Sequence, residues 1–82
     1  MRFMDVHTGM SGVTREQLLE EHQKDQALEG KEQVKFIKAW ADPDSGKVFC
    51  LSEGPSKEAV LRIHEQAGHP TQEIYPLPIE IE

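Results

Sequence analysis

Imidazole and thiol side chains are the groups of this sequence best suited to chemistry. The 82-residue chain contains four histidines and one cysteine, namely His7, His22, His64, His69 and Cys50. Imidazole and thiolate bind borderline divalent ions, and imidazole also gains or loses a proton near neutral pH. Five such groups in so short a chain favour a site for a metal ion or a small ligand.

Two of the histidines are expected on helices, each on the side that faces the core. His22 follows Leu18 by one turn on a stripe that continues to Asp25, so this stripe becomes polar where an ordinary core stripe stays apolar. On a second helix, His64 shares the apolar stripe that includes Ile63. We therefore expect both imidazoles to point inward, with Asp25 orienting the ring of His22 or binding the ion itself.

The other candidate ligands come from a strand and from the ends of segments. Cys50 lies in a strand-like run, and we expect it to point up between the two helices. Gly68 ends the second helix and can turn His69 back towards it. His7 follows Asp5 on one strand face, which favours a histidine–carboxylate couple at the sheet edge. Each residue has an ordinary alternative as a hydrogen-bonded core histidine, a solvated loop histidine or a small buried thiol.

The segments that must position these residues alternate between strand and helix. Their order predicts a β-α-β-β-α-β, ferredoxin-like α+β domain over residues 1–82, with both helices on one face of a four-stranded antiparallel sheet. Pro76 and Pro78 place the last strand at an edge or at a dimer seam. The expected elements are a strand over 2–8, a helix from a Thr14–Gln17 capping box to 27 or 28 that Gly30 ends, strands over 34–40 and 47–52 joined by a turn, a helix over 57–67, and a strand over 74–81.

Both faces of the predicted hairpin are apolar, which favours a homodimer. If Trp40 pairs with Val48, one face carries Phe36, Trp40, Val48 and Cys50, and the other carries Ile37, Ala39, Phe49 and Leu51. Two helices can cover only one of these faces. We therefore expect the second face to pack against another copy of the chain.

Composition excludes several classes of partner. The chain has 15 acidic and 9 basic residues and a formal charge of -6, which argues against binding a nucleic-acid backbone. No apolar stretch approaches the roughly 20 residues of a membrane span. One cysteine excludes an intrachain disulfide, and without a basic-then-apolar leader the chain is predicted to be cytoplasmic. Acidic residues such as Glu20 and Glu21 are expected to be solvated.

The sequence contains distinctive blocks at residues 4–10 with 12–14, 21–25, 38–43, 49–53 and 60–69. In this order the blocks resemble the short bacterial nickel-binding proteins, a family long catalogued as a domain of unknown function. The resemblance extends from residue 3 to about residue 74. It implies a ferredoxin-like fold, a homodimer, a cytoplasmic location and nickel binding for sequestration, and the positions that coincide with the family's pattern are His7, His22, Asp25, Cys50, His64 and His69.

Three functions are compatible with these residues. The first is a small homodimeric protein that binds nickel for sequestration or storage without turnover, and that takes up zinc or copper in vitro. The second is a small dimeric α+β barrel enzyme, an oxygenase or isomerase, with a His/Asp/Cys pocket and a histidine as general base. The third is a scaffold dimer with structural histidines. A buried cavity between the helices and the sheet would favour the enzyme, and exposed histidines would favour sequestration.

Overall fold

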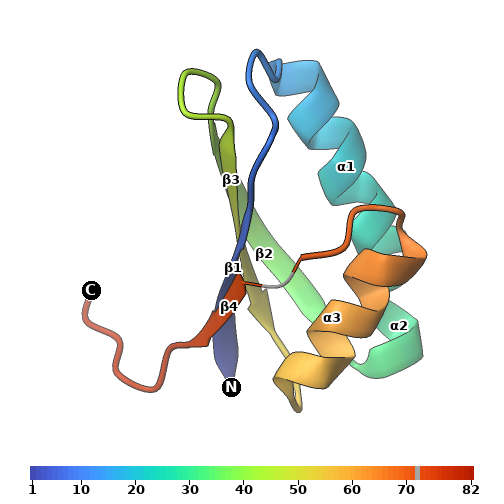
Figure 1. The fold of residues 1–82 in the computed structure, drawn as a ribbon. Coiled ribbons are helices and arrows are strands. Elements are labelled where there is room, and N and C mark those ends of the chain that lie inside the picture. Colours follow the sequence, from blue (N-terminus) through green and yellow to red (C-terminus); the bar gives the residue numbers. More distant parts are fainter. Residues whose placement is uncertain (72) are drawn as a thin grey trace.

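The computed structural model describes residues 1–71 and 73–82 and shows a sheet covered on one face by helices (Figure 1). The four strands are antiparallel and lie in the order β2-β3-β1-β4. This arrangement confirms the predicted α+β, ferredoxin-like fold. The elements are β1 (Arg2–His7), α1 (Arg15–Ala27), α2 (Glu29–Glu32), β2 (Lys35–Asp42), β3 (Lys47–Glu53), α3 (Lys57–Gln66) and β4 (Glu73–Pro76).

The start of α1 and its predicted end at residue 27 or 28 are confirmed, but the predicted stop at Gly30 is wrong. Thr14 Oγ1 accepts a hydrogen bond from the backbone N of Gln17 at 3.1 Å, and the side chain of Gln17 accepts one from the backbone N of Thr14 at 2.9 Å. These two bonds are the capping box. Gly30 does not end the helical segment, because it lies within the additional one-turn helix α2. The chain leaves that helix at Gln33, which has a positive φ of 60°.

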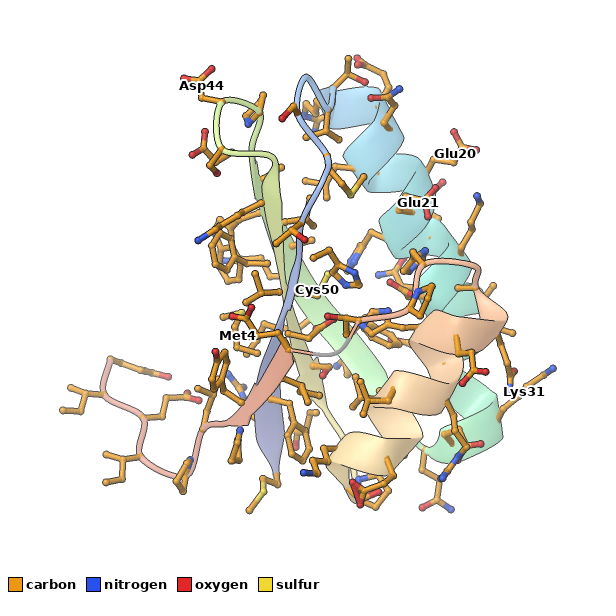
Figure 2. The ribbon with its side chains drawn as sticks, in the orientation of Figure 1. Met4, Glu20, Glu21, Lys31, Asp44 and Cys50 are labelled. Carbon is orange, nitrogen blue, oxygen red and sulfur yellow. The ribbon has the colours of Figure 1, made fainter. Side chains whose placement is uncertain are left out.

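The apolar core is divided into two clusters beneath the helices. The cluster under α3 joins Val60 and Ile63 to Phe3, Val34, Phe36 and Ala59. The cluster near α1 joins Val13, Val48 and Cys50, with Leu18 and Ala39 packed against them. Cys50 therefore points towards the helices, as predicted, and Figure 2 shows it on the opposite side of the sheet from Met4.

A bulge corrects the predicted hairpin register. The pairing of Phe36 with Ser52 is followed by that of Lys38 with Leu51, so one residue of β2 is left over between them. Trp40 consequently pairs with Phe49 instead of Val48 and lies on the face without helices, where it is 43% exposed. Ala39 turns to the helix side instead. The prediction that Phe36, Val48 and Cys50 share one face is confirmed, and this face is the one that the helices cover.

The last strand is an edge strand, as its prolines predicted. It is shorter than expected, because β4 ends at Pro76. The backbone N of Leu77 still donates to the carbonyl of Arg2 at 2.9 Å, and the chain then leaves the sheet (Figure 1). Ile79 and Ile81 in this tail are exposed. Among the described residues, none of the helices has the length and apolar character to cross a membrane.

We predict that Gly46→Ala destabilises the protein by about 1–3 kcal/mol. Gly46 has a φ of +74°, and a Cβ there would lie 2.8 Å from the backbone N of Ser11, in the loop that leads to α1. The matched control is Gly30→Ala, because Gly30 lies in a helix and a Cβ there meets nothing within 4 Å. Urea unfolding should show the control unchanged or slightly more stable, and equal effects of the two changes would contradict the prediction.

Candidate metal centre

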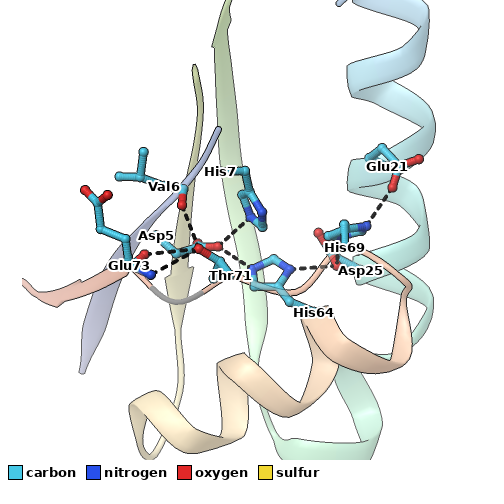
Figure 3. Close-up of polar contacts among 9 residues, drawn as sticks. All are labelled: Asp5, Val6, His7, Glu21, Asp25, His64, His69, Thr71 and Glu73. Carbon is cyan, nitrogen blue, oxygen red and sulfur yellow. Dashed lines mark hydrogen bonds and ion pairs between the residues drawn. The ribbon is translucent and has the colours of Figure 1, made fainter. Parts of the chain in front are cut away.

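The side groups of six residues lie in a row beneath the helices, in which imidazoles and carboxylates alternate (Figure 3). We call this the Asp–His chain. Asp5 Oδ2 lies 2.8 Å from His7 Nε2 and 2.6 Å from His64 Nε2. Asp25 Oδ1 lies 3.1 Å from His64 Nδ1 and 2.7 Å from His69 Nε2. The last contact joins His69 Nδ1 to Glu21 Oε2 at 2.6 Å.

Strand alternation and helix spacing position the middle of the Asp–His chain. Asp5 and His7 lie two apart on β1, so both face the helices. His64 follows Ile63 on α3, and both are completely buried. Asp25 is the buried residue of α1. A strand and two helices therefore meet at these side chains.

The loop after α3 brings His69 back to the cluster, as the sequence predicted. Gly68 has a φ of +88°, and the backbone N of His69 donates to the carbonyl of His64 at 3.0 Å. Thr71 Oγ1 then donates to the carbonyl of Val6 at 2.6 Å, which ties the loop to β1 (Figure 3). These bonds hold His69 over the end of α3, next to Asp25.

Both aspartates of the Asp–His chain are charged although they are buried. The exposed fraction is 0% for Asp5 and 1% for Asp25. Burial by itself raises the pKa of a carboxyl, but the contacts of Asp5 with His64 and His7 outweigh burial and lower its pKa below 3.8. The contacts of Asp25 with His64 and His69 lower its pKa in the same way.

His64 is the positive partner of both carboxylates. Burial opposes its charged form, but the contacts with Asp25 and Asp5 prevail and raise its pKa from 6.5 to about 9. Burial, and next the charges of Asp5 and Asp25, raise the pKa of the Cys50 thiol far above its ordinary value. In the metal-free protein near neutral pH, His64 is therefore a cation and Cys50 is a neutral thiol.

Several buried polar atoms around this cluster have no hydrogen-bond partner within the described part of the chain. Although His64 Nε2 approaches Asp5 closely, and His69 Nδ1 approaches Glu21, neither contact has hydrogen-bond geometry. Unpaired buried polar atoms are costly and uncommon. The atoms without a hydrogen bond are Asp5 Oδ1, His22 Nδ1, Ser52 Oγ, His64 Nε2 and His69 Nδ1. The two imidazole nitrogens of His64 and His69 have ionic partners, so Asp5 Oδ1 and His22 Nδ1 are the atoms near the cluster that fit a further ligand.

The ligand atoms converge in two groups that fit a metal ion. The Asp5 group consists of Asp5, His7, Cys50 and His64, and the Asp25 group consists of Asp25, His64 and His69. Within each group the ligand atoms lie within 4.8 Å of one another. Imidazole nitrogen, carboxylate oxygen and thiolate sulfur form a donor set that suits nickel, zinc or copper.

A pocket of about 210 Å³ lies next to both groups. His22 contributes to its wall but belongs to neither group, and its Nε2 accepts a hydrogen bond from Gln26 at 3.1 Å. Asp25 therefore contacts His64 and His69 and does not orient His22. The pocket is lined by His7, Met10, Leu18, Glu21, His22, Asp25, Ala39, Val48, Cys50, Gly68 and His69.

The structure brings together most of the candidate ligands predicted from the sequence. His7, Asp25, Cys50, His64 and His69 all belong to the two groups, and His22 does not. The predicted couple of His7 with Asp5 is present, but it lies on the internal strand β1 and not at the sheet edge.

Two members of the Asp–His chain were missing from the predicted ligands. Asp5 was considered only as a partner of His7, although its place on the same strand face was a usable signal. Glu21 was expected to be solvated, yet it contacts His69 at 2.6 Å. Its position one helical turn before Asp25 is the signal that links it to the cluster.

A ferredoxin-like sheet that buries imidazoles, carboxylates and a thiol together defines a small α+β protein with a metal-ligand cluster. Residues 3–77 match the family described as "Nickel responsive protein SCO4226-like". The chain belongs to this family, which confirms the resemblance in the sequence. It is also similar to the crystal structure of SCO4226 from Streptomyces coelicolor A3(2), with 56% identity, a TM-score of 0.96, and coverage of 99% of this chain and 100% of that chain. No curated protein gives a significant match.

We predict that the metal-free protein loses stability as the pH rises from 6.5 to 9. The pKa of His64 is higher in the folded chain, so its stabilising contribution is fully present below 6.5 and is lost as the pH passes through about 9. The lowered pKa values of Asp5 and Asp25 have the opposite effect, because their contribution is lost below 3.8. Stability should therefore be highest between about pH 4 and 6.5.

Urea unfolding at a series of pH values measures this dependence. The loss between pH 6.5 and 9 should be on the order of 2–3 kcal/mol. The control is His64→Gln, which keeps a polar side chain but cannot become charged, and the loss should be largely absent in it. An equally steep loss in both proteins would rule out His64 as its source.

Proposed function

We propose that this protein binds nickel at the Asp–His chain and Cys50, and that it acts in nickel sequestration or storage without catalytic turnover. The observation that carries this proposal is the convergence on His64 of two ligand groups, of which the Asp5 group is fully buried and the Asp25 group is partly exposed at His69. The family description, which calls its members nickel responsive, agrees with it. Zinc and copper share these ligand preferences and should bind in vitro.

The electrostatics of the Asp5 group suit a divalent ion. Asp5 is already charged, and a metal ion would also remove the proton of Cys50, because a coordinated thiol is deprotonated. One carboxylate and one thiolate then neutralise a divalent ion, with two imidazoles as neutral ligands. A buried ion with balanced charge avoids the large cost of an isolated charge in the interior.

We predict that His64→Ala weakens nickel binding at least about tenfold, because the ring belongs to both groups. Isothermal titration of metal-stripped protein with nickel, and then with zinc and copper, measures the affinity, which should be about micromolar or tighter for nickel in the unchanged protein. His22→Ala is the comparison, because it removes an imidazole outside both groups, and it should keep most of the affinity. Equal weakening in both variants would reject the assignment, and indiscriminate millimolar uptake by the unchanged protein would reject the function.

We also propose that the protein is a homodimer whose copies pack through the face of the sheet that lacks helices. We call this the bare face. The register places Trp40 opposite Phe49, and Met4 opposite both Leu51 and Tyr75. All three helices lie on the other face (Figure 1). Apolar side chains that line a contiguous face are typical of a protein interface.

We predict that Trp40→Glu weakens the dimer by about 30-fold or more, because a charge replaces a large aromatic side chain on the bare face. Light scattering during size-exclusion chromatography at micromolar concentration measures the mass. Leu19→Glu is the matched control, because Leu19 is 46% exposed, close to the 43% of Trp40, but lies on α1. A monomeric unchanged protein, or a control that also dissociates, would contradict this interface.

The same proposal includes the domain organisation, the cellular location and the kind of partner that the sequence predicts. The protein is a single domain over residues 1–82 that works in the cytoplasm, where a free thiol such as Cys50 stays reduced. Its net charge of -6 favours cations over nucleic acid as partners.

The pocket supports one alternative function, that of a small enzyme. The sequence hypothesis required a cavity between the helices and the sheet, and a pocket of about 210 Å³ lies there with His7, His22 and His69 in its wall. A histidine in that wall would act as general base. Its volume is below the roughly 300 Å³ of ordinary ligand sites. Binding of small organic ligands to metal-free protein, without nickel binding, would favour this alternative.

A further inference from the structure

Residues 77–82, which follow β4, form a tail on the side of the sheet that lacks helices. Figure 1 shows the sheet between this tail and the helices. Arg2 Nη1 donates a hydrogen bond to Glu80 Oε2 at 3.3 Å. Arg2 lies two residues before Met4 on β1, so its side chain belongs to the bare face. The ion pair therefore holds the middle of the tail on that side of its own sheet.

The tail exposes two large apolar side chains. Ile79 is 85% exposed and Ile81 is 91% exposed. Glu80 lies between them, and neighbouring side chains of an extended chain point to opposite sides. Because Glu80 turns to Arg2 of its own sheet, we expect both isoleucines to point away from that sheet, and their exposure agrees with this. Two such side chains together are typical of a segment that binds a partner.

Two prolines exclude binding by strand addition at this edge. The backbone N of Leu77 donates inward to the carbonyl of Arg2, so the alternating pattern turns Pro76 and Pro78 to the outer edge. Neither proline has an N–H group that could pair with a further strand. A partner of the tail must therefore bind its side chains.

We propose that the tail is an arm that crosses to a second copy of the chain, where Ile79 and Ile81 pack against the partner's Trp40. This inference rests on the proposed homodimer. It goes beyond that proposal, because it adds to the interface a segment that lies outside the bare face.

The symmetry of a dimer brings the tail of one copy to the correct edge of the other. The sheet order places β2 and β4 at opposite edges. If two such sheets pack face to face about a two-fold axis along the strands, the β4 edge of each copy lies over the β2 edge of the other. Packed sheets lie about 10 Å apart, and an extended tail of this length spans roughly 20 Å. The tail can therefore reach the partner's β2.

The surface of β2 complements the tail in shape of contact and in charge. Trp40 is half-exposed there, and Lys38 Nζ lies 5.8 Å from the centre of its ring. The tail presents two isoleucines for the aromatic ring, and Glu80 and Glu82 for the cation. Opposite charges on two surfaces steer their encounter and disfavour other partners. This match favours a second copy of the chain as the occupant.

Removal of the two apolar side chains tests the arm. Ile79→Ser combined with Ile81→Ser should raise the dissociation constant of the dimer at least about tenfold, as measured by sedimentation equilibrium. Leu19→Ser is the matched control, because Leu19 is an exposed aliphatic residue of α1, and it should leave the constant unchanged. An unchanged constant in the double variant would overturn the arm and leave the dimer through the bare face standing. A monomeric unchanged protein would reject both.

Disulfide trapping identifies the copy that receives the tail. In a chain with both Lys38→Cys and Ile81→Cys, oxidation should join two chains, which non-reducing electrophoresis detects as a covalent dimer. Each single variant is a control that should remain a single chain on the gel, because Cys50 is buried. A disulfide within one chain would place the tail on its own sheet and overturn the proposal, and so would the absence of any disulfide.

Discussion

Two carboxylates, Asp5 and Asp25, lie completely beneath the helices of this small protein, and the surrounding structure depends on their compensation. A buried carboxylate without partners is far less stable than a hydrated one. His64 lies between the two and contacts both, while His7 and His69 contact them from the outer sides. This arrangement requires β1, α1, α3 and the loop after α3 to meet at one place. The cluster is therefore also the junction of the fold.

Much of the fold was predictable because its signals are local. The capping box of Thr14 and Gln17 and the order of the elements depend on residues close in sequence. The hairpin register was not predictable in this way, because one extra residue between Phe36 and Lys38 reverses the side on which Trp40 lies. Alternation alone cannot locate such a bulge, because both faces of β2 carry apolar residues.

The same distinction applies to the candidate site. Periodicity placed His64 and Asp25 on inward-facing stripes, and both are buried. It also placed His22 there, but only tertiary packing decides which inward-facing residues meet, and His22 contacts Gln26 instead. Glu21 was missed because its contact with His69 spans two segments that are distant in sequence. Contacts of this kind depend on how the loop at Gly68 turns, which a single sequence does not specify.

The two helices that flank the cluster are attached to the sheet in different ways. Helix α3 buries Ala59, Val60 and Ile63, whereas Asp25 is the one residue of α1 that is buried. Apolar packing therefore holds α3 in addition to the ionic contacts of His64, whereas α1 is held by the ionic contacts of Asp25 and by the partly buried Leu18. Native-state opening should consequently be a graded process, in which the amides of α1 exchange with solvent through local fluctuations while those of α3 exchange only in larger unfolding events.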